Sequence, residues 1–426
     1  MTLLLTLLFL VTLLLVGVPV AFALGAVGLG LLFFADFSLL IVPQTLLSSV
    51  DSFVLLAVPL FLLMSNILLK GGVGHDLFAA VQAWVGHWPG GLAVTTIVSC
   101  GLFAAISGSS VATAATIGTV AIPEMVERGY PRRLVLGLLA AAGTLGILIP
   151  PSIPMIIYAF ITEQSVIDLF LAGIGPGLIL IVLFCGFSMI YVRLSTDYRP
   201  SQKATWALRL STTRRALPSA LLAIAIVAGI YAGAFTPTEA AAIGFGLSIF
   251  VTVVILRTMT WDLFKQAVFA AMKTTVLVLL IVAGAKLFGH AITLYRIPYD
   301  ISQAIIAYAS DPLVFVALVA LVLLLMGLFL ESLAMMLIMV PVLAPALSPI
   351  GIDPVWFGVF FVIMIEVALI TPPVGMNLYV IQSVAKTSIG EVAAGVWPFI
   401  LLMIATVAAI ALFPGLALYL PFGLGL

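Results

Sequence analysis

Charged side chains are scarce in this sequence of 426 residues: Asp, Glu, Lys and Arg make up 8% of it, whereas 64% is hydrophobic. A soluble domain carries about 25% charged residues, so a water-facing surface cannot be built from this chain. The mean hydropathy is +1.37. Apolar stretches recur from Leu3 to Leu420, and the alternation typical of a β-barrel is absent. The composition predicts an all-α polytopic membrane protein with about ten to fourteen passages, some of them broken.

Cysteine and histidine are equally rare, which excludes several kinds of site. Cys100 and Cys185 both lie in apolar runs, so neither a disulfide framework nor a zinc site with thiolate spacing is indicated. The three histidines have no mutual metal spacing. Because 16 Lys and Arg balance 16 Asp and Glu, no nucleic-acid partner is expected.

Enzyme motifs are missing as well. The sequence contains no GxxxxGK[ST] phosphate loop, so we do not expect it to hydrolyse ATP. It also lacks HExxH, GxSxG and the set of kinase motifs. We therefore predict that the chain is not an enzyme and that it transports a small polar solute.

The positions of the basic residues predict the orientation in the membrane. Three connections carry most of the Lys and Arg and are expected in the cytoplasm: one near Arg128, one over residues 193–218, and one between Arg257 and Lys265. Residues 36–51 and 161–168 carry no Lys or Arg and are expected to face outward.

An internal repeat divides the chain. Four anchors recur 222 positions apart: Ser110 and Ser332, Pro123 and Pro345, Gly129 and Gly351, and Pro150-Pro151 and Pro372-Pro373. Met155 and Met376 continue the repeat with one residue of slippage. Earlier in each half, Pro19 and Pro237 correspond at an offset of 218. We predict a first repeat over residues 1–192, a basic cytoplasmic connection over 193–218, and a second repeat over 219–426. An odd number of passages in each half would make the repeats inverted, the common plan of secondary transporters.

Two kinds of interrupted segment occur once in each half. The first kind is too short on either side of its polar centre to span a membrane, which predicts re-entrant hairpins at about 92–128 and about 314–347. The second kind carries the tandem prolines. Proline lacks an N–H and stops the preceding helix, so carbonyls upstream lose their partners. In a membrane such carbonyls are tolerated only where they face protein, a cavity or a ligand.

Together these segments predict ion sites, because freed carbonyls and hydroxyls are hard oxygen ligands for small cations. The alternative is that the prolines only kink helices and the serines satisfy local backbone. The predicted cation ligands are Ser107, Gly108, Ser109, Ser110, Gly143, Thr144, Gly146 and Pro150 in the first half, and Leu330, Glu331, Ser332, Ala368, Thr371, Pro372 and Gly375 in the second.

Several ionisable residues lie inside apolar runs, where they are expensive. Glu331 and Glu366 are each interpreted as a cation ligand, a proton carrier or a structural partner, and these alternatives stay open. Glu239 follows Thr236 and Pro237 in the pattern of a helix start, which favours a capping role. Lys286 and His290 are expected to reach an interface. The segments 76–90 and 261–275 are amphipathic with tryptophan at their edges, which predicts helices along the membrane surface.

The motifs in combination resemble one transporter family. The strings ISGSSVATAATIG, GTLGILIPPSIPMIIYA, GAFTPTEAAAIG and ALITPPVGMNLYV are similar to the large membrane subunit of the TRAP (tripartite ATP-independent periplasmic) transporters, and the resemblance covers essentially the whole chain. It implies a multi-pass protein of the bacterial inner membrane with a scaffold and an elevator-type transport domain. It also implies sodium-driven uptake of a small organic acid such as a dicarboxylate or sialic acid.

The resemblance further implies a cofactor ion, partners and a solute site. Na⁺ would bind at the two predicted ion sites, and membrane lipid would surround the chain. The partners would be a periplasmic solute-binding protein and a small four-helix membrane subunit, expected as a separate chain because no such sequence precedes Met1. The solute would lie near Ser109, Pro151, Ser152, Glu331, Pro373, Met376 and Asn377. The alternatives are a stand-alone sodium/carboxylate symporter of the same superfamily, and a membrane channel or scaffold.

Overall fold

The computed structural model describes residues 2–35, 37–194, 198 and 201–423, and all regular structure in these ranges is helical. The first half contains α1 (Thr2–Leu15), α2 (Val20–Phe34), α3 (Ile41–Val50), α4 (Ala57–Lys70), α5 (Val73–Val85), α6 (Gly91–Ser107), α7 (Ser110–Glu127), α8 (Arg132–Leu148), α9 (Ile153–Thr162) and α10 (Val166–Leu194). The second half contains α11 (Trp206–Tyr231), α12 (Pro237–Phe250), η1 (Val251–Ile255), α13 (Trp261–Leu294), α14 (Ile297–Tyr308), α15 (Pro312–Met326), α16 (Ser332–Leu347), α17 (Pro354–Ile370), α18 (Met376–Ala385), α19 (Ile389–Leu412), α20 (Gly415–Leu418) and η2 (Tyr419–Gly423).

Fewer uninterrupted passages occur than the apolar stretches predict. Among the described residues, five helices are long and apolar enough to cross a membrane, namely α10, α11, α12 with η1, α13 and α19. Two bent pairs also qualify when each is taken together, α4 with α5 at 65° and α8 with α9 at 43°. The other apolar segments form helices of 10–17 residues. Glycine and proline break the apolar sequence into these shorter pieces.

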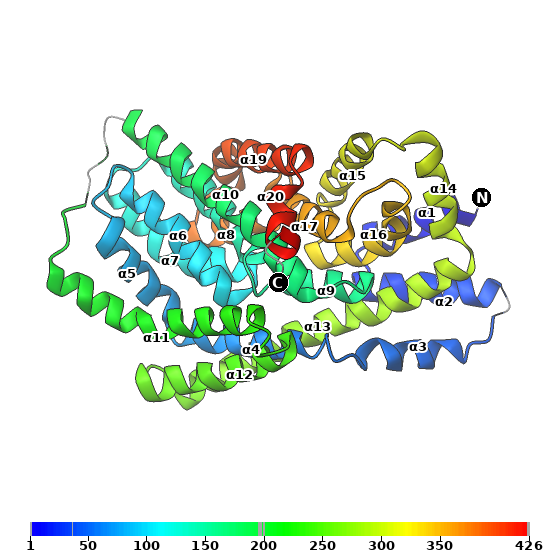
Figure 1. Ribbon diagram of the computed structural model, residues 1–426, viewed down its shortest axis with the longest axis horizontal. Helices are drawn as coiled ribbons and strands as arrows, with labels where there is room; N and C mark the ends of the chain where they lie inside the picture. Colours follow the sequence, from blue (N-terminus) through cyan, green and yellow to red (C-terminus); the bar gives the residue numbers. More distant parts are fainter. Residues whose placement is uncertain (1, 36, 195–197, 199–200, 424–426) are drawn as a thin grey trace.

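Helix α13 corrects the prediction of a separate surface helix at 261–275. These residues are the beginning of one continuous helix of 34 residues, which spans about 51 Å at 1.5 Å per residue. The other predicted surface helix, at 76–90, corresponds mostly to α5, which is separated from α4 by Gly71 and Gly72 and meets it at 65°. Its position along the membrane surface stays a prediction. Helix α2 packs along α13, and Figure 1 shows both running through the right half of the molecule.

The basic connection is partly helical. Helix α11 begins at Trp206, whereas Arg199 and its neighbours 195–197 and 200 lie outside the described residues. Arg209 lies 5.2 Å and 5.3 Å from the ring centroids of Trp84 and Trp206 and donates to the Ala83 carbonyl at 3.2 Å. These contacts fasten α11 to α5.

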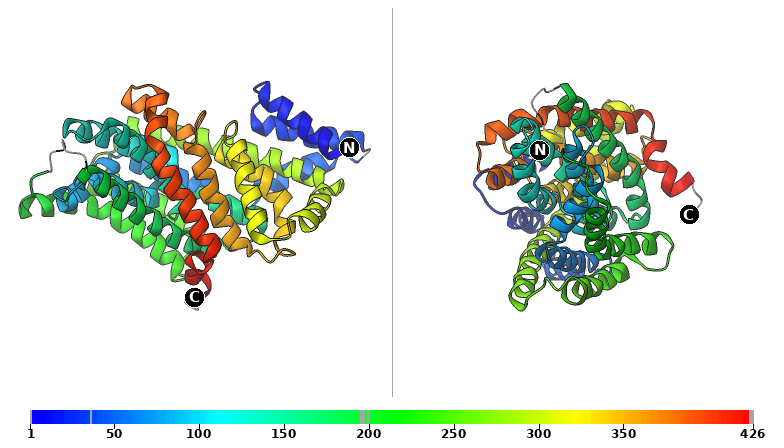
Figure 2. Two further views of the ribbon diagram at one scale, coloured as in Figure 1. Left: turned by 90° about the horizontal axis from the view of Figure 1, so that it is seen from above. Right: turned by 90° about the vertical axis from the view of Figure 1, so that its left-hand side faces the viewer.

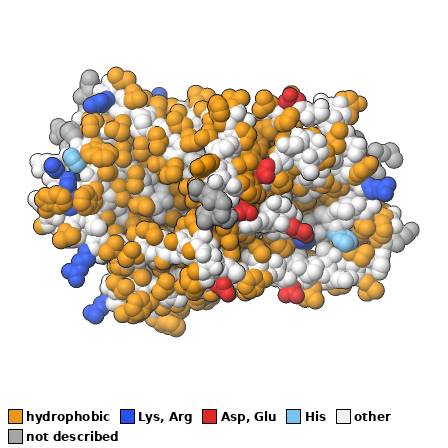
Figure 3. Space-filling model, in the orientation of Figure 1, with side chains coloured by type: hydrophobic (Ala, Val, Ile, Leu, Met, Phe, Trp, Pro, Cys, Tyr) orange, Lys and Arg blue, Asp and Glu red, His pale blue; other side chains and the backbone are white. Residues whose placement is uncertain are grey.

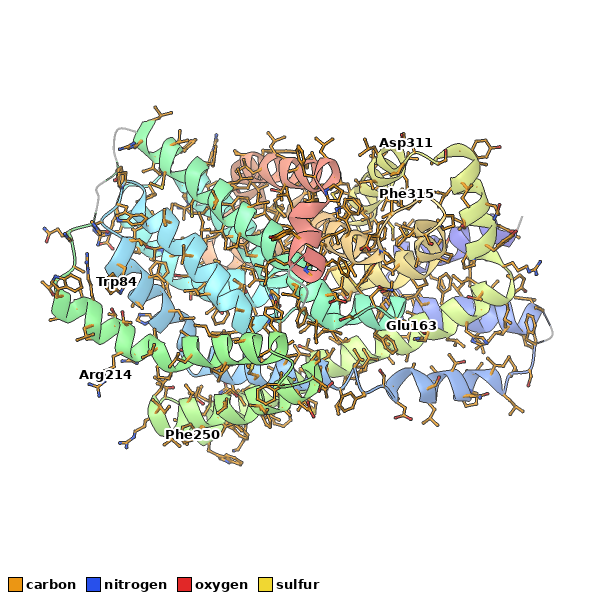
Figure 4. All side chains as sticks on the ribbon, in the orientation of Figure 1. Trp84, Glu163, Arg214, Phe250, Asp311 and Phe315 are labelled. Carbon is orange, nitrogen blue, oxygen red and sulfur yellow. The ribbon has the colours of Figure 1, made fainter. Side chains whose placement is uncertain are left out.

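The charged side chains are unevenly distributed along the molecule, which bears on its expected orientation in the membrane. Basic side chains gather at the left end of the visible face, and acidic ones lie mostly in the right half (Figure 3). Figure 4 places Trp84 and Arg214 at the left end, and Glu163 and Asp311 in the right half. By the positive-inside rule we expect the left end to face the cytoplasm.

The two halves contain the same order of interrupted elements and pack into each other. In each half two short helices precede a helix that stops at the tandem prolines, and a ten-residue helix follows, α9 or α18. Helix α9 packs on α16 of the second half, and α18 packs on α7 of the first half. Figures 1 and 2 show these elements in the middle of an elongated molecule, with α1 projecting at one end.

Helices α8 and α19 cross at a pair of glycines. A Cβ atom on Gly137 would lie 1.9 Å from the Gly395 oxygen, and one on Gly395 would lie 2.0 Å from the Arg133 oxygen. Because the obstructing atoms are backbone, the helices can only move apart.

We expect Gly137→Ala to destabilise the protein by about 1–3 kcal/mol, the usual cost of overpacking, and to lower the midpoint of thermal unfolding in detergent. Gly30→Ala in α2 is the matched control, since its Cβ meets nothing within 4 Å and gains the same helix propensity. A Gly137→Ala protein that melts as high as the Gly30→Ala protein would contradict the close crossing.

Candidate transport site

The tip of the first hairpin is a compact turn between α6 and α7, which pack against each other. Gly108 ends α6 with a positive φ of 58°, a conformation that glycine adopts without strain. Ser109 is the N-cap of α7, and its hydroxyl accepts from the Ala112 N–H at 3.4 Å. Serine is a favoured N-cap residue, so the sequence SGSS turns the chain within two residues.

Three oxygens meet at this tip. The Ser107 Oγ and Thr113 Oγ1 atoms are 2.7 Å apart, and Thr113 donates to the Ser109 carbonyl at 2.8 Å. Ser107 Oγ lies 3.3 Å from the same carbonyl. Thr113 is fully buried, and the sequence analysis missed it. Its signal is its position four residues after Ser109, which places its hydroxyl beside that carbonyl in a helix.

Helix α8 closes over the tip through two glycines. A Cβ on Gly146 would lie 2.7 Å from the Ser109 oxygen and 2.8 Å from Thr113 Oγ1, and one on Gly143 would lie 2.7 Å from the Ala114 Cβ. Pro150 has no N–H, so the Gly146 carbonyl loses its helical donor. Of the predicted ligands of the first half, Ser107, Gly108, Ser109, Gly143 and Gly146 lie at this tip. The Thr144 hydroxyl instead donates to the Ala141 carbonyl at 2.6 Å, the Ser110 hydroxyl points to α18, and Pro150 lines a separate cavity beside α11.

The first tandem-proline element lies against the same tip. A Cβ on Gly108 would lie 2.8 Å from the Pro151 oxygen. Ser152 is the N-cap of α9, where its hydroxyl accepts from the Met155 N–H at 3.4 Å. Pro150 and Pro151 are both buried. The Pro150-Pro151 and Pro372-Pro373 peptide bonds are both cis. The first half of the site is therefore mostly buried, and Ser109 at the tip is half-buried.

The second half of the site is more open. Pro373, Val374 and Met376 are exposed. Pro372 removes the helical donor of the Ala368 carbonyl, which accepts from the Thr371 N–H at 3.2 Å instead. Thr371 Oγ1 donates to the Val367 carbonyl at 2.7 Å. Gly375 begins α18 with a positive φ of 51°.

The helices of the second predicted hairpin are separated. Helix α15 packs on α17 and α16 packs on α14, but α15 and α16 make little contact with each other. Their connection is five residues long, from Gly327 to Glu331, compared with two residues in the first half. A cavity of about 880 Å³ lies between them, lined by Val322, Leu325 and Met326 of α15 and by Ile338, Met339 and Val342 of α16. Leu330, Glu331 and Ser332 are consequently half-buried.

Two hydrogen bonds of Asn377 join the two halves at the site. Ser110 Oγ donates to Asn377 Oδ1 at 3.4 Å, and Asn377 Nδ2 donates to the Ala140 carbonyl at 3.4 Å. Asn377 is fully buried, so in this conformation its amide links α18 to α7 and α8.

The acidic residues have three different surroundings. Glu239 completes a capping box with Thr236, so its predicted capping role is confirmed. Glu331 is the N-cap of α16 but makes no capping hydrogen bond. Glu366 is 1% exposed, and neither carboxylate oxygen has a hydrogen-bond partner among the described residues.

Family membership follows from the whole chain. The family model described as "Tripartite ATP-independent periplasmic transporter, DctM component" matches residues 7–416. The chain belongs to this family. It is a multi-pass inner-membrane permease subunit of a TRAP transporter and not an enzyme, as the sequence predicted.

Two curated relatives support the assignment. A C4-dicarboxylate TRAP transporter large permease protein of Pseudomonas aeruginosa is 39% identical over 407 residues, 95% of each chain. An isethionate TRAP transporter permease protein, DctMQ, of Oleidesulfovibrio alaskensis is 34% identical over 95% of this chain and 64% of its own length. Because that relative extends well beyond the match, the separate small subunit stays a prediction.

The fold is shared with a more distant transporter. The crystal structure of the YdaH transporter of Alcanivorax borkumensis superposes with a TM-score of 0.63 over 98% of both chains, at 17% identity. The all-helical membrane fold predicted from the sequence is confirmed.

Proposed function

We propose that this permease subunit couples the sodium gradient to the uptake of a small organic acid. The observation that carries the proposal is the oxygen cluster of Ser107, Ser109 and Thr113, against which helix α8 packs at Gly146. The carbonyl of Gly146 has no helical donor, because Pro150 lacks an N–H. Neutral hydroxyl and carbonyl oxygens are hard ligands, which suit a small cation such as Na⁺. The relatives named for C4-dicarboxylate and isethionate transport are the reason for choosing an organic anion as solute.

A second sodium ion would bind between the α15–α16 connection and the second tandem-proline element. A Cβ on Gly327 would lie 2.3 Å from the Ala368 Cβ, so this connection and the end of α17 are in direct contact. The solute would bind between the two halves, where Ser110 meets Asn377, and Pro373 and Met376 form its exposed side.

Thr113 provides the test of sodium coupling. We expect Thr113→Val to raise the sodium concentration for half-maximal uptake by about tenfold, since it removes one ligand hydroxyl while keeping the shape of the side chain. Uptake into proteoliposomes is measured against a sodium gradient, with potassium as the substituted cation. Thr119→Val is the matched control on the same helix, because Thr119 is exposed and bonds only the Thr116 carbonyl. An unchanged sodium response in Thr113→Val would remove this cluster as the site.

Two partners complete the proposed transporter: a periplasmic solute-binding protein and a small four-helix subunit. The discriminating measurement is uptake with and without a candidate periplasmic binding protein. Uptake by the permease alone at the full rate would favour a stand-alone sodium/carboxylate symporter. Solute flux that needs no sodium gradient would favour a channel.

The mechanism that we propose is an elevator-type movement of one unit against a scaffold. Helices α9 and α18 each pack on the opposite half, so the hairpins and tandem-proline elements form one interlocked unit. Helices α2, α4, α12 and α13 pack on one another as a second group, which would be the scaffold.

A further inference from the structure

A polar cavity of about 550 Å³ lies between the proposed scaffold and the proposed moving unit. On the scaffold side its walls are α13 and α3, which packs on α13 and is counted with the scaffold. Its opposite wall consists of Phe160 and Ile161 of α9 with Leu337 and Pro341 of α16. The residues proposed for the sodium and solute sites do not line it. It is therefore a different place from the transport site.

Two polar helix faces meet across this cavity. Lys286, His290 and Thr293 follow one another at spacings of four and three on α13, and Gln44 and Ser48 are four residues apart on α3. Residues at these spacings share one face of a helix. Lys286 and His290 are both exposed to the cavity, so neither side chain serves as the hydrogen-bond partner of a buried polar group.

Lys286 brings an unbalanced positive charge into a membrane-spanning helix. Among the described residues no carboxylate lies within ion-pair distance of its ammonium group, which instead lies 4.3 Å from the centroid of the Phe160 ring. His290 and Gln44 have no hydrogen-bond partner in the described parts of the chain. A charge at such a depth is costly and is typical of a functional site.

The cavity belongs to the outer half of the molecule. Helix α13 starts beside the basic connection that holds Arg257 and ends at Leu294, so Lys286 lies eight residues, about 12 Å, from the outer end. Figure 3 shows a histidine and a basic side chain in this region, with an acidic side chain beside the basic one. Glu163, which ends α9 (Figure 4), is not part of the lining.

We propose that this cavity is an oxyanion site that receives a carboxylate of the incoming solute before the solute reaches the hairpin tips. The ammonium group of Lys286, the amide of Gln44 and an N–H of His290 are donors without acceptors, and donors of this kind bind carboxylates by charge-assisted hydrogen bonds. The volume is within the range of small-ligand pockets, about 300–1,000 Å³. The inference rests on the proposed function for the identity of the solute. The same donors would accept a lipid phosphate, and the experiment separates the two.

Lysine acetylation measures occupancy directly. The full chain is placed in phosphatidylcholine nanodiscs and treated with an acetylating reagent, and the modification of each lysine is read by peptide mass spectrometry. We expect succinate to lower acetylation of Lys286 at least about fivefold, because the bound carboxylate holds the ammonium group. Its uncharged diamide should have no effect. Lys273 is the internal control, since it is exposed on the same helix but does not line the cavity.

Three results would overturn the proposal. The first is equal protection of Lys286 and Lys273, the second is protection by the diamide as well, and the third is protection by added phosphatidylglycerol with none by succinate. The third result would assign the cavity to a lipid headgroup.

Uptake kinetics give an independent readout. Lys286→Gln should raise the KM for the solute about tenfold and leave the maximal rate within about twofold, the pattern of a lost binding contact. Lys286→Arg should retain most of the affinity, and Lys273→Gln should leave both constants unchanged. A lost maximal rate with unchanged KM would contradict a receiving site. Protection of Lys286 without any sodium-driven uptake would count against the proposed function alone.

Discussion

A reversible crosslink between cysteines at Ser48 and Ile161 is expected to stop uptake completely, and its reduction should restore the original rate. Ser48 belongs to α3 and Ile161 to α9, and both line the cavity between the proposed scaffold and moving unit. An elevator-type cycle moves these walls past each other. A short bifunctional thiosulfonate reagent that spans the cavity would lock them together, in a background in which Cys100 and Cys185 are replaced.

Each single cysteine variant, treated with the same reagent, is the control for blocking of the cavity itself. At saturating solute both should retain more than about half of the untreated maximal rate, because one attached chain leaves the walls free to move, although the KM would rise where the reagent occupies the proposed receiving site. A crosslinked double variant that transports at the full rate would rule out a large displacement between α3 and α9. The mechanism would then be a local gate at the hairpin tips.

Gly146→Ala is expected to lower the apparent sodium affinity by about 10- to 100-fold, the range found when the supports of metal ligands are changed. The added Cβ would lie 2.7 Å from the Ser109 oxygen and 2.8 Å from Thr113 Oγ1. Because the Ser109 oxygen belongs to the backbone, it cannot swing aside as a side chain could. The hairpin tip must therefore move away from α8. The measurement is uptake as a function of sodium concentration, together with the thermal unfolding midpoint.

Gly186→Ala in α10 is the matched control, because a Cβ there meets nothing within 4 Å while the gain in helix propensity is the same. The control should keep its sodium response. If Gly146→Ala also responds normally to sodium, the carbonyl at Gly146 and the oxygens at the tip are not the ion site. A protein that fails to insert would instead show a low unfolding midpoint, which separates instability from lost binding.

Much of the site could be predicted because glycine and proline act locally. The break at Ser107–Ser110 and the stops at both tandem prolines follow from residues that cannot continue a helix, and the structure has helix ends at 107, 148 and 370. The capping role of Glu239 follows from three neighbouring residues in the same way. Thr113 was missed because its hydroxyl matters only once α8 lies against the tip.

Other features depend on contacts between distant segments. The sequence suggested a second hairpin like the first, but α15 and α16 each pack on other helices and leave a cavity between them. Lys286 and His290 line a cavity formed by four helices, which the sequence did not predict, and their reach to the membrane interface stays a prediction. Neither outcome can be read from apolar periodicity, since the pattern of one helix does not say which other helices will pack against it.

The sequence by itself determined that this protein lies in a membrane, is helical, and carries the same interrupted elements in both halves. It did so because charge content, apolar length and the backbone limits of glycine and proline are properties of short segments. Only the tertiary structure decided which oxygens meet at the Ser107–Thr113 cluster, that Ser110 reaches Asn377, and that Lys286 faces a cavity. Those contacts join residues up to 267 positions apart, and their distances are set by how the helices pack, which no local pattern encodes.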